Sequence, residues 1–161
     1  MNSPFNLQER FSVDIGATEP EILLPDELSF QWLFYGQVFC FVARNSSRRL
    51  ADAWAKRILD LASTWDTAQL MISYHDFSDP RCVMTPYVRA KNEEMVRLYP
   101  NINTFSVAVM NPNLLTWLLS QATRVNVGEH RISRLFTNHD QALHALQAKL
   151  EKLKSKNEPK T

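Results

Sequence analysis

The chain has 161 residues, of which 45% are hydrophobic and 22% are charged, and its formal net charge is +1. This length and composition are typical of a single soluble globular domain with a sizeable core. The near-neutral charge argues against a dedicated nucleic-acid-binding domain. The apolar runs fall far short of the about 20 residues that a membrane span needs, and the polar start lacks the apolar core of a signal peptide. We therefore expect a cytoplasmic protein.

The first 27 residues are irregular and contain three prolines. Phe11, Val13 and Ile15 alternate with polar neighbours, which permits one short strand. We expect an extended arm that lies on the domain or on a partner subunit. A loosely ordered terminus is the alternative.

A hairpin is predicted next. Residues 28–35 and 37–43 flank Gly36, and glycine accepts the positive φ that a tight turn demands. The run Val-Phe-Cys-Phe-Val at residues 38–42 is apolar on both faces. It therefore predicts a central strand that is covered on both sides.

The first helix is predicted from its cap and its spacing. Residues 45–47 supply capping side chains, and the helix should run to about Thr64. Its apolar residues recur at steps of three and four, which places them on one face: Leu50, Trp54, Ile58, Leu61 and Trp65. Residues 69–74 then predict a strand, and residues 75–80 a polar loop.

Thr85 should cap the second helix, with Pro86 at its first position, where the missing N–H of proline costs nothing. This helix should end near residues 99–100. Residues 105–110 predict the next strand, which has one face of Phe105, Val107 and Val109 and another of smaller residues.

The third helix should start at Asn111 and Pro112. Its apolar residues cover roughly 200° of the helix surface, against about 100° for an ordinary surface helix. They are Leu114, Leu115, Trp117, Leu118, Leu119, Ala122 and Val125. Such an excess indicates burial at a subunit interface, against a bound ligand, or under the N-terminal arm.

Residues 131–136 predict the most polar strand, which we therefore place near an edge of the sheet. Asn138 should cap the final helix, whose packing stripe would be Leu143, Leu146, Leu150 and Leu153. The alternation of elements predicts one α/β domain, with a mixed sheet of four to five strands and about four helices. Its parts would be an arm (1–27), the domain (28–150) and a basic flexible tail (151–161).

Three pieces of the sequence carry a resemblance to a known family. They are the hairpin and helix WLFYGQVFCFVARNSSRRLADAWAKRIL, the strand FSVAVM, and the ending HRISRLFTNHDQALHALQAKL. In this order they resemble STAS-like domains, the fold of anti-sigma-factor antagonists and sporulation-antagonist-like proteins, over about residues 28–150. The resemblance implies a regulatory module that acts through protein contacts, and it has lipid-binding relatives.

In the regulatory branch of that family, a serine at a helix start is phosphorylated by a partner kinase. The family's Asp-Ser-Ser-Gly run is absent here, and Thr85 occupies a similar location. Thr85 is therefore a candidate phosphorylation switch, since a helix N-terminus tolerates a phosphate. An ordinary helix cap is the other interpretation.

Reactive side chains are sparse. His75, Asp76 and Cys82 could form an acid–base or nucleophilic site, and His139-Asp140 repeats the His–Asp pair. Neither these residues nor Cys40 show a recognised metal-ligand or disulfide spacing. With only three glycines, well separated, a glycine-rich phosphate loop is excluded.

We therefore expect no cofactor and no metal. The favoured function is a non-catalytic binding or regulatory module that acts through protein–protein contacts, with a protein partner or by self-association as a homodimer. Its interface candidates are Trp117, Leu114, Leu118, Arg48 and Arg49, the two arginines pointing to an acidic partner or a bound anion. The alternative is a carrier of a small molecule or lipid with an apolar pocket, and an enzyme using His75, Asp76 and Cys82 is a third class.

Overall fold

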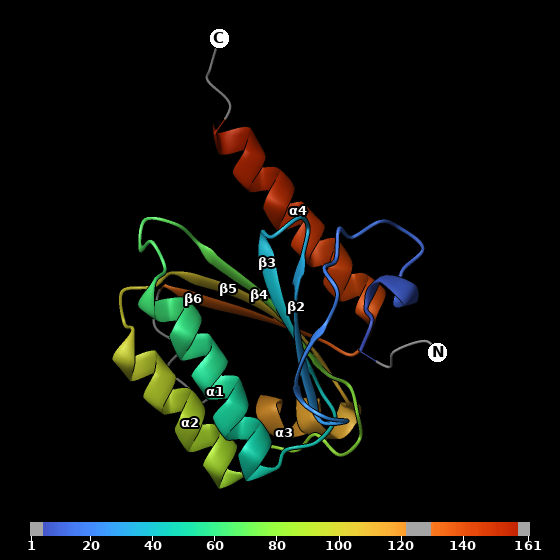
Figure 1. Cartoon of the computed structure of the whole chain (residues 1–161), viewed down its shortest axis with the longest axis vertical. Helices are drawn as coiled ribbons and strands as arrows, with labels where there is room; N and C mark the ends of the chain where they lie inside the picture. Colours follow the sequence, from blue (N-terminus) through green and yellow to red (C-terminus); the bar gives the residue numbers. More distant parts are fainter. Residues whose placement is uncertain (1–4, 122–129, 158–161) are drawn as a thin grey trace.

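The computed structural model describes residues 5–121 and 130–157. These residues form one six-stranded mixed sheet in the order β1-β2-β3-β4-β5-β6, flanked by four α-helices (Figure 1). The strands are β1 (Glu21–Leu24), β2 (Leu28–Leu33), β3 (Val38–Ala43), β4 (Met71–Phe77), β5 (Thr104–Met110) and β6 (Arg131–Phe136). The helices are η1 (Gln8–Arg10), a short 3-10 turn, and α1 (Arg48–Ser63), α2 (Pro86–Leu98), α3 (Pro112–Gln121) and α4 (His139–Asn157).

The α/β class and the single domain are confirmed, but the sheet has six strands rather than four to five. The additional strand, β1, lies in the N-terminal arm and pairs antiparallel with β2. Residues 11–15, whose alternation permitted a short strand, are not a strand; Phe11 and Ile15 are instead buried in an irregular segment. Because β1 is only four residues long and half exposed, its sequence lacks the alternation that reveals a strand.

The hairpin is confirmed. β2 and β3 pair antiparallel from Leu28↔Ala43 to Leu33↔Val38, and Phe34, Tyr35 and Gly36 in the turn all have positive φ. The strands β3 to β6 are mutually parallel, so each connection crosses the sheet through a helix. The predicted caps are also confirmed, because Ser47 and Thr85 accept hydrogen bonds from the N–H groups of Leu50 and Val88.

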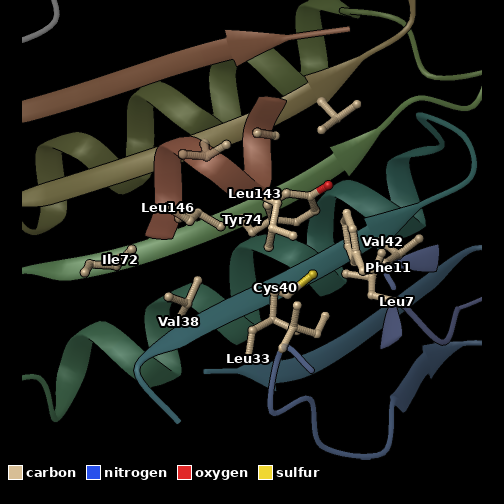
Figure 2. Close-up of a cluster of buried hydrophobic side chains, with 14 of the residues drawn as sticks. Leu7, Phe11, Leu33, Val38, Cys40, Val42, Ile72, Tyr74, Leu143 and Leu146 are labelled. Carbon is tan, nitrogen blue, oxygen red and sulfur yellow. The ribbon is translucent and has the colours of Figure 1, made fainter. Parts of the chain in front are cut away.

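The two faces of the sheet carry different helices (Figure 1). On one face, α1, α2 and α3 cover a core that includes Phe30, Phe39 and Phe41. On the other face, α4 and the N-terminal arm cover a second core, seen in Figure 2: Leu7, Phe11, Leu33, Val38, Cys40, Val42, Ile72, Tyr74, Leu143 and Leu146. The prediction that β3 is covered on both sides is thus confirmed.

The chain ends agree in part with the prediction. In α4, Leu143, Leu146 and Leu150 are buried as expected and Leu153 packs against them. The helix continues through Asn157, so residues 151–157 of the predicted tail are helical; the last four residues, 158–161, lie outside the described range, as do residues 1–4 of the arm. β6 lies at one edge of the sheet, as its polarity predicted.

Candidate ligand-binding pocket

The structure places His75 and Asp76 on opposite faces of the sheet, whereas His75 and Cys82 line the same pocket. The predicted loop 75–80 is wrong in its first half, because β4 continues through Phe77 and is paired with β3 and β5 up to Asp76. Consecutive residues of a strand point to opposite faces, so His75 and Asp76 cannot act as a couple. His75 lies on the α1–α3 face, stacked between the rings of Phe41 (5.8 Å) and Phe77 (5.6 Å).

Asp76 fastens the N-terminal arm to the sheet on the α4 face. Its carboxylate is 1% exposed and accepts hydrogen bonds from Arg10 Nη1 (2.5 Å) and from Ser78. Arg10 also donates to His139 Nε2 at 3.2 Å. The neutral His139 ring therefore carries its proton on Nδ1, which lies 2.7 Å from Tyr74 Oη. His139 and Asp140 do not form a His–Asp pair either, because His139 bonds to Arg10 and Tyr74 while Asp140 is exposed at the start of α4.

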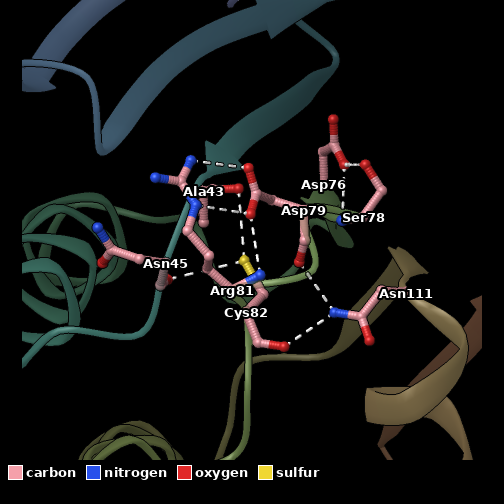
Figure 3. A network of polar contacts seen from close by, with 8 residues as sticks. All are labelled: Ala43, Asn45, Asp76, Ser78, Asp79, Arg81, Cys82 and Asn111. Carbon is pink, nitrogen blue, oxygen red and sulfur yellow. Dashed lines mark hydrogen bonds and ion pairs between the residues drawn. The ribbon is translucent and has the colours of Figure 1, made fainter.

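Cys82 is held by backbone groups (Figure 3). Its Sγ lies 3.5 Å from the carbonyl oxygen of Ala43 and 3.7 Å from that of Asn45. Asn111 Nδ2 donates to the carbonyls of Asp79 and Cys82, which fixes the loop between β4 and α2. Burial raises the pKa of the Cys82 thiol to about 12, so the thiol stays protonated at neutral pH. Both cysteines are free, and within residues 5–121 and 130–157 no group of His, Cys, Asp and Glu could hold a metal ion.

A pocket of about 610 Å³ opens on the α1–α3 face, between α2 and α3 and over β4, β5 and β6. A smaller cavity of about 110 Å³ lies between α1, α2 and the sheet and shares part of the same wall. The residues common to both are Trp54, His75, Asn92, Val96, Thr104, Ser106 and Arg131. None of these except Trp54 and His75 attracted attention in the sequence.

The sheet beneath the two helices changes from polar to apolar along the direction of its strands. Ser73, Ser106 and Ser133 are aligned across β4, β5 and β6, and we call them the serine row. Ser73 Oγ donates to Ser106 Oγ at 2.8 Å, which shows that these side chains share a face. Towards the carboxyl ends of the strands the floor becomes apolar, with Ala108, Met110, Leu135 and Phe77.

His75 joins the serine row. Its Nε2 lies 3.0 Å from Ser73 Oγ, and because that hydroxyl donates to Ser106, the imidazole donates from Nε2 and keeps Nδ1 as an acceptor. Burial lowers the His75 pKa to about 4, so the ring is neutral at neutral pH. His75 Nδ1 and Trp54 Nε1 are both buried and have no hydrogen-bond partner among the described residues.

The predicted interface residues on α3 differ in exposure. Leu114 is buried, and it lines the pocket together with the half-buried Leu118. Trp117 is 37% exposed and Leu119 is 61% exposed on the same helix. Ala122 and Val125, the rest of the apolar arc, lie outside the described residues.

The other predicted site residues lie at helix starts. The Arg48 guanidinium lies over the ring of Tyr87 on α2, 5.2 Å from its centroid, while Arg49 is exposed. Thr85 Oγ1 accepts from the Val88 N–H at 3.1 Å, which is the geometry of an ordinary helix cap.

Comparison of the whole chain with known families, with curated proteins and with solved structures found no match. Among the described helices, none combines the length and the apolar character that crossing a membrane requires. The residues that sequence reasoning missed are the serine row and Arg131. The signal available in the sequence was a serine inside each of three strands, but only the register shows that the serines are neighbours.

Proposed function

We propose that this protein binds a small amphipathic molecule in the pocket between α2 and α3, as a carrier or a sensor rather than as a catalyst. The observation that carries the proposal is the pocket itself. A concavity of about 610 Å³ falls within the range of about 300–1,000 Å³ that is typical of ligand sites.

The wall of the pocket supports an amphipathic ligand. Leu114, Leu118 and Met110 surround the end nearest α3, where an apolar tail would be shielded from water. Each buried methylene contributes about 0.8 kcal/mol, so a tail of about ten would contribute about 8 kcal/mol before the cost of association, which is at least about 4 kcal/mol. Ser106, Ser133 and Arg131 line the opposite end and would receive a polar group.

The test compares two matched variants. Ala108→Leu places three more carbons on the pocket floor, while Ala148→Leu makes the same change on the exposed surface of α4. Wild type should bind a fluorescent apolar probe such as anilinonaphthalene sulfonate, or retain a ligand in native mass spectrometry. Ala108→Leu should lower the affinity by at least about tenfold with an unchanged circular dichroism spectrum, and Ala148→Leu should leave the affinity unchanged. Wild-type protein that binds no apolar probe, or an Ala108→Leu variant that binds as well as wild type, would refute the proposal.

A second candidate function rests on a separate observation. Trp117 and Leu119 expose apolar surface on α3, which supports the protein-contact module and self-association expected from the STAS-like resemblance. Trp117→Ala should then weaken association in sedimentation velocity more than it lowers the melting temperature. A variant that assembles normally but unfolds early would assign Trp117 to packing alone. The resemblance and the Thr85 switch stay predictions.

A further inference from the structure

We propose that the polar group of the ligand is a carboxylate, and that Arg131 binds it. This inference rests on the proposed function and names the ligand class: an apolar monoanion such as a fatty acid. Arg131 lines both the pocket and the smaller cavity beside it. Within the described part of the chain, it is the only lysine or arginine in either wall.

The position of Arg131 is fixed by the sheet and by α2. It is the first residue of β6, paired in register with Thr104, one row before the serine row. Its Nη2 donates to the carbonyl oxygen of Tyr99 at 2.5 Å and reaches that of Val96 at 3.5 Å, both at the C-terminal end of α2. These bonds hold the side chain at the wall that the pocket and the smaller cavity share.

The bonds to the C-terminal end of α2 use only some of the N–H donors of the Arg131 guanidinium. Arginine has five N–H donors, and the two bonds to α2 use only Nη2. Nε and Nη1 have no hydrogen-bond partner, and no carboxylate pairs with Arg131, among residues 5–121 and 130–157. Burial lowers the pKa of Arg131, as expected for a cation that loses hydration without gaining an anion. A bound anion would supply that missing partner.

The chemistry of the surroundings favours a carboxylate over other groups. Nη1 carries two N–H donors that can bond a carboxylate oxygen, and the guanidinium supplies the positive charge that strengthens such a bond. The neighbouring Thr104, Ser106 and Ser133 side chains are hydroxyls, which can donate to the same group. Glu93, the one acidic residue in the described wall, accepts a hydrogen bond from Arg89 at 3.0 Å, so a ligand cation would find little free negative charge. A single arginine suits one negative charge.

The length of the pocket floor agrees with such a ligand. From the Arg131 row to the Met110 row the strands advance by six residues, which is about 20 Å. The polarity falls along this path from a cation, through the serine row, to Met110 and Leu135. A carboxylate at Arg131 therefore directs an alkyl tail towards α3.

The test uses decanoate and its uncharged analogue 1-decanol, each measured by displacement of the fluorescent probe. Wild type should prefer decanoate by at least about tenfold. Arg131→Gln should weaken decanoate binding by about 10- to 100-fold, the range for a hydrogen bond to a charged group, and leave decanol binding within about threefold. The matched control is Arg134→Gln, on the same strand but with its side chain on the opposite face, and it should change neither affinity.

Arg131→Lys guards against a folding defect, because it keeps the charge and loses the planar set of N–H donors. It should bind decanoate with an affinity between those of wild type and Arg131→Gln. Equal wild-type affinities for decanoate and decanol would overturn this inference and leave the proposed function intact, whereas binding of neither would overturn both. A folded Arg131→Gln variant that loses both ligands equally would show that Arg131 only shapes the pocket, and this result also overturns the inference.

Discussion

The buried histidine of the pocket floor makes the stability of the protein depend on pH. His75 has a pKa of about 4 in the folded chain, against an ordinary value of 6.5, because burial disfavours its charged form. Between these two values the unfolded chain binds more protons than the folded chain. The free energy of unfolding should therefore fall as the pH falls below about 6.5, and a difference of this size gives a loss of about 2 kcal/mol between pH 7.5 and pH 5.

The perturbation that isolates this effect is His75→Phe. Phenylalanine preserves the stacking between Phe41 and Phe77 but does not titrate. The free energy of unfolding should be measured by urea denaturation at several pH values from 5 to 7.5, in wild type, His75→Phe and the control His144→Phe, which lies exposed on α4. His139 also has a lowered pKa from burial, but it is present in all three chains and cancels in the comparison.

The expected result is a smaller pH dependence in His75→Phe alone, by about 2 kcal/mol over this range. The absolute stability of the variant at pH 7.5 is not the readout, since the bond to Ser73 is lost and the change in packing adds its own term. If the curves of wild type and His75→Phe are parallel, His75 is not held neutral by burial and the description of the pocket floor is wrong.

Two further predictions concern the N-terminal arm and are measured by urea denaturation. Arg10→Met and Asp76→Asn should each lower the free energy of unfolding by about 2 kcal/mol, which is less than for a fully buried ion pair because the Arg10 side chain is 26% exposed. The double variant should show a coupling energy above about 1 kcal/mol, and additive losses would contradict the ion pair. Gly16→Ala should cost about 1–3 kcal/mol, because Gly16 has φ +53° and a Cβ there would lie 2.9 Å from the ring of Tyr35. The cost should shrink in a Tyr35→Ala background, which removes the ring, and an unchanged cost would contradict the steric argument.

The elements that the sequence predicted best are those with local signals. Ser47 and Thr85 mark helix starts through side chains that bond to nearby N–H groups, and Gly36 marks a turn through its own φ. The end of β4 was missed because His75 and Asp76 look like loop residues. They are tolerated inside the sheet because long-range partners satisfy them: Arg10, 66 residues away, bonds to Asp76, and aromatic rings of β3 and β4 enclose His75.

The pocket could not be predicted for a related reason. Ser73, Ser106 and Ser133 are about thirty residues apart in the sequence, and each is ordinary by itself. Their alignment depends on the register of three parallel strands, which is fixed by packing and not by any local pattern. The broad apolar arc of α3 was a real signal, but it could not distinguish a subunit interface from the wall of a pocket.

The origin of the pocket lies in a difference of side-chain size between the two faces of the same strand. On β5, Phe105, Val107 and Val109 face α4 and are buried in its core. The alternate residues, Ser106 and Ala108, face α2 and α3, and they are too small to fill the space beneath these helices. The α4 face is therefore closed by large side chains, while the opposite face keeps a concave floor. This is why a single enlargement at Ala108 tests the proposed function more directly than any change on the helices.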